Sequence, residues 1–239
     1  MSSCFIALGS NQGQSSRAFD LAIKTLDSHP RFSLQRSSSN YRSTAMGSNA
    51  GGDYLNAVAE FETDVSLPEI LEQLQSLEAQ AGRQKKAPWE SRTLDLDLLY
   101  CDDLVENTPQ LSLPHPGAWY RRFVLTPMCE IAPGFVHPVY GETQSECLAR
   151  IDRRPLTVQL VGCDIYSGSI EDLGHRFREV HFDSPLLPDP SEGLIVVGKK
   201  SDGLKESVPQ VDLSKLPGDN LEALESVLQA VLGRCELAN

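Results

Sequence analysis

Residues 94–98, with the sequence Leu-Asp-Leu-Asp-Leu, constrain the fold more than any other part of the chain because apolar and acidic side chains alternate there. Successive side chains of a β-strand point to opposite faces. The leucines can therefore line a core while Asp95 and Asp97 share the other face. The alternation predicts a strand with one buried face and one carboxylate-bearing face.

Two carboxylates on one face of a strand stand about 7 Å apart. A partly buried pair must share a proton, find cations or hold a metal, since like charges repel. A pair of oxygen ligands suits Mg²⁺, which completes its shell with water and phosphate oxygens. A basic cluster within residues 83–92 directly precedes the pair, as binding of a polyphosphate would require. An amphipathic edge strand with a solvated face explains the alternation equally well.

Composition narrows the possible classes of protein. The formal net charge of −12 argues against nucleic acid as a partner. No apolar run approaches the length of a membrane span, and the N-terminus favours a first strand over a signal peptide, so we expect a cytoplasmic protein that does not bind membranes. The six cysteines lack Cys-x-x-Cys spacing, which argues against zinc and against a disulfide framework. The sequence does not indicate an oligomeric state.

The first part of the chain predicts the element order βαββαβ. Apolar spacing predicts strands near residues 4–8, 32–41, 54–63 and 94–100, and helices over residues 17–26 and 68–82. This order is that of an α+β, ferredoxin-like sheet with its helices on one face. The segment that follows, rich in proline, predicts mostly loops and then a helix over residues 142–151.

Arg153-Arg154-Pro155 marks the expected domain boundary. We expect a first domain over residues 1–154 and a small α/β extension over residues 155–239. The extension is predicted to contain strands at 156–161 and 194–197 and helices at 170–177 and 221–232. Its sequence indicates no function.

Several short motifs follow one another in a recognisable order. They are Leu8-Gly9-Ser10-Asn11, Tyr41-Arg42-Ser43, Gly47, Asp53-Tyr54-Leu55-Asn56, Glu78, Gly82-Arg83, Trp89, Arg92-Thr93-Leu94-Asp95-Leu96-Asp97, Pro114-His115-Pro116, Arg121 and Phe123. Over about residues 4–150 this order resembles that of the 6-hydroxymethyl-7,8-dihydropterin pyrophosphokinase family. The resemblance implies a ferredoxin-like fold and transfer of pyrophosphate from ATP to the hydroxymethyl group of the dihydropterin, with release of AMP, in folate biosynthesis.

The resemblance also implies roles for individual residues. Asp95 and Asp97 would be the ligands of two Mg²⁺ ions, with Arg92 and Lys85 as the other catalytic residues. ATP, the co-substrate, would be bound by Gln75, Glu78, Lys85, Arg92, His115 and Arg121. The pterin would be bound by Asn11, Ser43, Met46, Gly47, Tyr54, Asn56, Trp89 and Phe123.

The sequence departs from the family pattern in two places. Lys85 stands where the family usually has arginine, and lysine lacks the planar fork that grips phosphate. Glu90-Ser91 replaces the usual Gly-Pro. We expect the loops at residues 43–53 and 82–91 to close over bound substrates.

Two other functions remain compatible with the carboxylate pair. One is a metal-dependent phosphoesterase or nuclease, which would need a water-activating base but no aromatic pair. The other is a nucleotide-binding module without catalysis, which the two departures would favour. Pterin-dependent release of AMP distinguishes the pyrophosphokinase from both.

Overall fold

The computed structural model describes residues 1–12, 14–44, 52–82, 93–184, 188–189, 191, 193–198 and 207–238. The first half follows the predicted order, with β1 (Ser2–Ser10), α1 (Ser15–Asp27), β2 (Phe32–Ser37), β3 (Tyr41–Ser43), β4 (Tyr54–Thr63), α2 (Leu67–Gln80) and β5 (Asp95–Cys101). The predicted second strand is divided into β2 and β3, and both pieces pair with β4. The βαββαβ prediction is confirmed.

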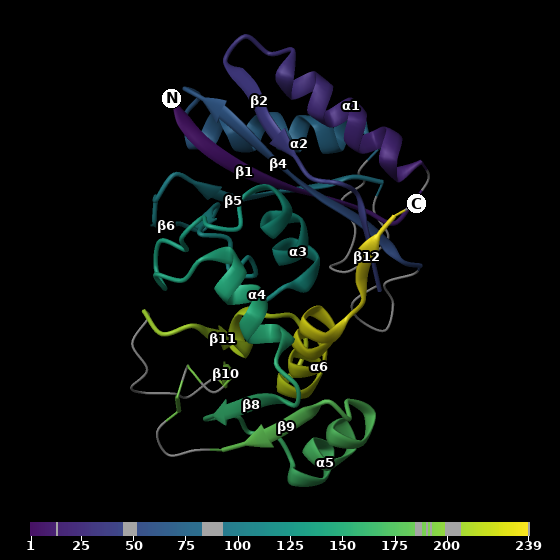
Figure 1. Ribbon diagram of the computed structural model, residues 1–239, viewed down its shortest axis with the longest axis vertical. Helices are drawn as coiled ribbons and strands as arrows, with labels where there is room; N and C mark the ends of the chain where they lie inside the picture. Colours follow the sequence, from purple (N-terminus) through teal and green to yellow (C-terminus); the bar gives the residue numbers. More distant parts are fainter. Residues whose placement is uncertain are drawn as a thin grey trace.

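The main sheet has the strand order β12-β3-β4-β1-β5, with β2 alongside β4. Helices α1 and α2 cover one face of this sheet (Figure 1). Leu94, Leu96 and Leu98 are buried on that face, where they pack with Phe19 of α1 and Ile70 of α2. The predicted division of β5 into a core face and a carboxylate face is therefore confirmed, which leaves Asp95 and Asp97 on the opposite face.

Helix α3 (Arg122–Ile131) packs against that opposite face of the sheet, although the sequence predicted mostly loops there. Val124, Met128 and Ile131 give α3 a buried stripe at helical spacing. The prediction was wrong because a proline-rich segment favours loops, whereas Pro127 lies inside this helix. A short hairpin of β6 (Glu106–Asn107) and β7 (Ser112–Leu113) precedes α3.

The second half contains α4 (Gln144–Asp152), β8 (Leu156–Val161), α5 (Ser167–Arg176), β9 (Val180–Asp183), β10 (Leu194–Val197), β11 (Gln210–Asp212), the 3-10 helix η1 (Leu213–Lys215), α6 (Asn220–Leu232) and β12 (Cys235–Leu237). The predicted strands at 156–161 and 194–197 agree with β8 and β10, which lie in a parallel sheet of order β11-β10-β8-β9. Among the described helices, none is long and apolar enough to cross a bilayer.

Packing does not stop at the expected boundary near residues 153–155. Trp119 and Leu125, which precede the boundary, belong to the same buried cluster as Leu156 and Leu228, which follow it. The last strand, β12, runs back from α6 to the main sheet and pairs with β3 (Figure 1). The two halves of the chain therefore share an apolar core and a sheet.

Candidate active site

The floor of the candidate site is the face of the sheet opposite α1 and α2. Gly9 of β1 lies between Asn56 of β4 and Asp95 of β5, and Ala7 occupies the corresponding place beside Asp97. Paired residues of antiparallel strands project from the same face. Because Ala7 and Gly9 are small, they leave space above the central strand between the polar side chains of its neighbours.

Strand β5, which carries the two acids, is held from its outer side as well. It ends the strand order of the sheet, so its outer backbone groups need partners other than a strand. The backbone N–H of Leu96 donates to Oε1 of Glu78 at 3.0 Å, and the carbonyl of Leu99 accepts from His115 N at 2.9 Å. Leu96 lies between the two acids, so Glu78 fixes the stretch of backbone that presents them.

Two of the residues predicted to contact ATP, Glu78 and Gln75, lie outside the cavity described below. The Glu78 side chain is buried between α2 and β5, and Gln75 lies on the exposed side of α2. Neither residue belongs to the described lining of the cavity below. The structure shows Glu78 as an acceptor for the backbone of β5, and the ATP contacts of Glu78 and Gln75 stay predictions.

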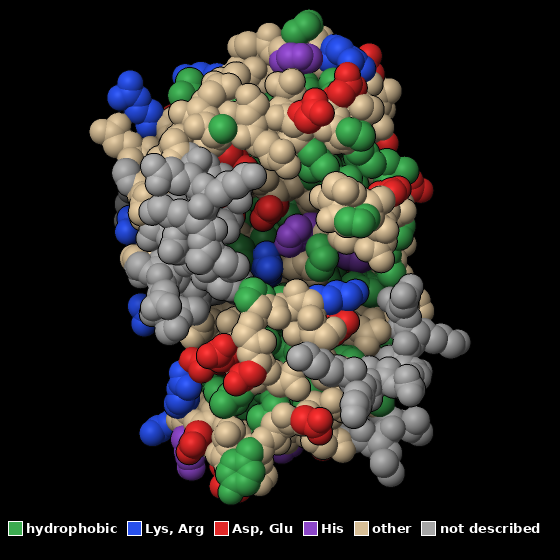
Figure 2. Space-filling model, turned by 180° about the vertical axis from the view of Figure 1, so that it is seen from behind, with side chains coloured by type: hydrophobic (Ala, Val, Ile, Leu, Met, Phe, Trp, Pro, Cys, Tyr) green, Lys and Arg blue, Asp and Glu red, His purple; other side chains and the backbone are tan. Residues whose placement is uncertain are grey.

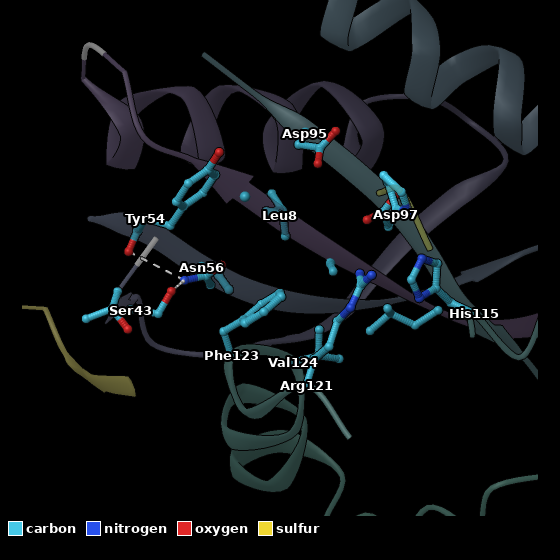
Figure 3. A pocket seen from close by; sticks show the side chains of 16 residues that line it. Leu8, Ser43, Tyr54, Asn56, Asp95, Asp97, His115, Arg121, Phe123 and Val124 are labelled. Carbon is cyan, nitrogen blue, oxygen red and sulfur yellow. Dashed lines mark hydrogen bonds between the residues drawn. The ribbon is translucent and has the colours of Figure 1, made fainter. Parts of the chain in front are cut away.

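A cavity of about 260 Å³ lies over this floor. The predicted residues that line it are Ser43, Tyr54, Asn56, Asp95, Asp97, His115, Arg121 and Phe123. Figure 3 shows Asp97 and His115 on one side of the cavity and Tyr54, Asn56 and Ser43 on the other, with Phe123 and Arg121 between them. The structure thus brings together residues from β3, β4, β5, the segment before α3 and α3 itself.

One side of the cavity presents a fixed amide next to an aromatic ring. The Asn56 side chain is buried, and its Nδ2 donates to Ser43 Oγ at 2.8 Å. Ser43 is buried too and pairs with Tyr54 across the β3–β4 ladder. An amide held in one orientation can read the donor and acceptor pattern of a flat heterocycle, and aromatic rings can stack on it.

Arg121, which is half-buried, brings a cationic group to the middle of the cavity. Its guanidinium carbon lies 5.9 Å from the centroid of the Phe123 ring, within the range of a cation–π contact. Arg121 Nε is buried and has no hydrogen-bond partner among the residues that the structure describes. The guanidinium group reaches into the cavity (Figure 3), and its positive charge suits an anionic ligand.

The position of Arg121 depends on a glycine. A Cβ built on Gly117 would lie 2.3 Å from Arg121 Nε. Any other residue at position 117 would therefore displace the guanidinium. Sequence reasoning missed Gly117, because a glycine required for the packing of a neighbouring side chain leaves no pattern in the sequence.

His115 lies on the same side of the cavity as Asp97 (Figure 3), and its ring is neutral. Burial lowers the pKa of His115 to about 4, although the carboxylate of Asp97 acts in the opposite direction. His115 Nδ1 accepts a hydrogen bond from Gly117 N at 3.1 Å, so the proton of the neutral ring lies on Nε2. Near neutral pH His115 can therefore donate one hydrogen bond to an oxygen in the cavity.

The carboxylate pair fits Mg²⁺ better than a transition metal. Asp95 and Asp97 are half-buried and line one cavity. Among the described residues there is no group of three or more His, Cys, Asp or Glu that could hold a metal. Magnesium is commonly bound by one or two carboxylates, with water and phosphate oxygens as the remaining ligands, whereas zinc sites use three or four protein ligands.

The described lining of this cavity does not include the other predicted residues. Asn11 lines a neighbouring cavity, which shares Tyr54 with the first. Met46, Gly47, Lys85, Trp89 and Arg92 lie outside the described residues, as do Glu90-Ser91 and most of the two loops expected to close. Their roles stay predictions.

Seen from behind, the molecule has a hollow near its middle where acidic, basic and histidine side chains lie close together (Figure 2).

The cavity also has lining residues that the sequence did not indicate. Thr44 follows β3, and Pro217 lies between η1 and α6 in the second half of the chain. Pro217 could not have been found from a local pattern, because it reaches the cavity through long-range packing.

Comparison with known proteins agrees with this geometry. Residues 5–133 match the family model described as 7,8-dihydro-6-hydroxymethylpterin-pyrophosphokinase (HPPK). The chain is 35% identical, over 166 residues, to a 2-amino-4-hydroxy-6-hydroxymethyldihydropteridine pyrophosphokinase of Synechocystis sp., covering 70% of this chain and 84% of the relative. It is 38% identical over 139 residues to the enzyme of the same name from Haemophilus influenzae, covering 58% of this chain and 86% of the relative.

The fold has solved counterparts as well. A crystal structure of wild-type HPPK-DHPS from Plasmodium falciparum, with pterin and p-hydroxybenzoate, is similar with a TM-score of 0.50. The two sequences are 10% identical, and the similarity covers 83% of this chain and 64% of that chain. At this identity the likeness supports the fold alone.

Proposed function

The chain belongs to the 7,8-dihydro-6-hydroxymethylpterin-pyrophosphokinase family, and we propose that the cavity between β3, β5 and α3 is where it carries out the reaction of that family. The reaction transfers the pyrophosphoryl group of ATP to the hydroxymethyl group of 6-hydroxymethyl-7,8-dihydropterin in folate biosynthesis. One observation carries the assignment to this cavity. A carboxylate pair with a half-buried arginine and a neutral histidine lies in the same cavity as a fixed amide between aromatic side chains.

The carboxylate end is assigned to the triphosphate. The guanidinium group of Arg121 would bind phosphate oxygens, and His115 Nε2 supplies a second donor without adding charge. Asp95 and Asp97 would hold two Mg²⁺ ions, which would supply charge neutralisation for the transferred group. Lys85 and Arg92 are proposed as further phosphate contacts.

The amide end is assigned to the pterin. Tyr54 and Phe123 would contact the faces of the ring system, and Asn56 would read its polar edge while Ser43 fixes the amide. In this arrangement the hydroxymethyl group would point toward Asp95 and Asp97, since the two ends belong to one continuous cavity. The chain would then align the acceptor oxygen with the triphosphate, and alignment is a large part of catalysis of phosphoryl-group transfer.

An AMP-release assay tests this function directly. Full-length protein is incubated with ATP and Mg²⁺, with and without hydroxymethyl-dihydropterin. We expect AMP only when the pterin is present. Phosphate release without pterin would indicate a phosphoesterase instead, and ATP binding without turnover would indicate a binding module. The cytoplasmic location of the protein stays a prediction from the sequence.

A further inference from the structure

The C-terminal end of the chain lies beside the part of the cavity assigned to the pterin. Strand β12 pairs with β3, which carries Ser43 (Figure 1). We propose that β12 and the end of α6 are a positioning element of the pterin subsite, which sets the affinity for the pterin through the backbone of β3 and the start of α3. This inference rests on the proposed function. Both β12 and α6 lie beyond the segment 5–133 that matches the family model.

The first contact is the β12–β3 ladder. Cys235 pairs with Ser43 in an antiparallel register, and the ladder continues as Ala238 N donates to Asn40 O at 2.8 Å. Strand β3 has only three residues, and without β12 it would have a strand partner on one side alone. Because Ser43 Oγ accepts from Asn56 Nδ2, a shift of β3 would release the amide that is assigned to the pterin edge.

The second contact is a close approach between the turn after α6 and the residue after Ser43. A Cβ built on Gly233 would lie 2.8 Å from Thr44 Oγ1 and 2.5 Å from the carbonyl oxygen of Gln229. Thr44 also lines the cavity. Gly233 thus allows the chain to pass directly against the cavity wall on its way into β12.

The third contact holds the opposite wall. Arg122 lies in sequence between the cavity residues Arg121 and Phe123, and its Nε donates to Val231 O in α6 at 2.9 Å. The same guanidinium pairs with Asp152 at the end of α4. Helix α6 therefore fixes the start of α3, from which Phe123 enters the cavity. Together the three contacts join both walls of the pterin end to one C-terminal segment.

The Gly233→Ala substitution tests the proposal in the full-length protein. The added methyl group would clash with Gln229 O and Thr44 Oγ1, so the turn from α6 into β12 must shift relative to β3. We expect this shift to loosen the arrangement of Ser43 and Asn56. We expect the KM for the pterin to rise by about tenfold, the factor that corresponds to one lost hydrogen bond, while the KM for ATP stays within about twofold of wild type. Gly174→Ala in α5 is the matched control. Apart from its chain neighbours and the backbone of its own helix, no described atom lies within 4 Å of a Cβ built on Gly174.

A second pair of variants tests the ladder itself. Ala238 and Asn40 form a hydrogen-bonded pair of the antiparallel ladder. Hydrogen-bonded and non-hydrogen-bonded pairs alternate along such a ladder. The backbone of Glu236, two residues earlier, is therefore hydrogen-bonded to β3, whereas the N–H of Leu237 points away from β3. Glu236→Pro should therefore raise the pterin KM, and Leu237→Pro should change it less.

The outcomes separate this inference from the proposed function. A selective rise of the pterin KM in Gly233→Ala and Glu236→Pro supports the inference. A fall in kcat alone, or an equal change in both KM values, would indicate a merely structural role and overturn it, as would an unchanged pterin KM in both variants. Wild-type protein that releases no AMP with the pterin would overturn the proposed function and this inference together.

Discussion

At the scale of single residues, the site depends on side chains whose chemistry the sequence revealed and on others whose role is purely geometric. The alternating pattern pointed to Asp95 and Asp97, whereas Tyr54, Asn56 and Phe123 were predicted from the resemblance to the family, and all five line one cavity. Gly117 could not, because its role is to leave room for Arg121. Such a role depends on a contact in space, which a linear pattern does not encode.

Gly117→Ala tests whether the placement of Arg121 matters for phosphate binding. The new methyl group would occupy the position of the guanidinium, so the charge-assisted contact to the triphosphate should weaken. We expect the KM for ATP to rise by about tenfold, in line with a lost hydrogen bond to a charged group, with little change in the KM for the pterin. Gly134→Ala should leave both constants unchanged, since no described atom lies within 4 Å of a Cβ built there.

His137 predicts how stability depends on pH. Its ring is buried and stacks on Tyr140 at 4.3 Å, and its Nδ1 faces the backbone N–H groups of Val139 and Tyr140 at 3.3 Å. Burial lowers the pKa of His137 to about 4 from its ordinary value of 6.5. The unfolded chain therefore binds the proton first, and the free energy of unfolding must fall as the pH drops from about 6.5 toward 4.

Chemical denaturation at a series of pH values measures this effect. Each proton taken up preferentially by the unfolded state gives a slope of about 1.4 kcal/mol per pH unit. His137→Asn should reduce this slope by up to the contribution of one proton. His115, whose pKa is also lowered, would still reduce the free energy of unfolding at acidic pH. A variant with an unchanged slope between pH 4.5 and pH 6, values chosen to lie within the expected window, would contradict the assignment.

At the scale of elements, the period of two in residues 94–98 predicted β5 and its two faces correctly. The prediction failed for α3, because Pro127 interrupts a helix that tertiary packing nevertheless stabilises. Strand β12 was also missed, since a strand of three residues carries too little periodicity to be recognised. Local patterns thus predict elements that are long and regular, and they miss those that exist because of a neighbour.

Glu78 gives a prediction at this scale, because it joins α2 to β5. Glu78→Ala would remove the acceptor of the Leu96 N–H in a buried region, at a cost of about 1–3 kcal/mol in stability. We expect turnover to fall as well, since Leu96 lies between the two acids. Glu78→Gln retains an acceptor oxygen and should keep more of both stability and activity. Glu72→Ala, on the exposed side of α2, is the control for loss of a glutamate from the same helix.

At the scale of the whole molecule, the sequence predicted two units, while the structure shows continuous packing between them. Trp119, Leu125 and Ile151 share one buried cluster with α6 and the parallel sheet. The composition change at residues 153–155 indicated a boundary but could not show what covers it. Contacts between segments far apart in the sequence are decided by shape and packing, and no single segment records them.

A chain ending at Arg154 tests this continuity. Removal of the second half would expose the buried side chains of Trp119, Leu125 and Ile151 and would leave β3 without β12. Burial of each such side chain contributes about 1.5–3 kcal/mol, which is a large share of the stability of an ordinary domain. We expect the truncated chain to be aggregated or unfolded in circular dichroism and denaturation experiments. A cooperative unfolding transition at the wild-type midpoint would show instead that the first half is self-sufficient.

The central claim is that the Asp95/Asp97 cavity carries out pyrophosphoryl transfer, and Asp97→Asn tests it most directly. The substitution keeps the shape of the side chain and removes its charge, and Asp103→Asn on the exposed turn after β5 is the control. The measurement is the initial rate of AMP release with ATP, Mg²⁺ and hydroxymethyl-dihydropterin. We expect this rate to fall at least about a hundredfold in Asp97→Asn, with an unchanged melting temperature. Asp103→Asn should retain the wild-type rate. AMP release by Asp97→Asn at the wild-type rate would contradict the assignment of pyrophosphoryl transfer to the Asp95/Asp97 cavity.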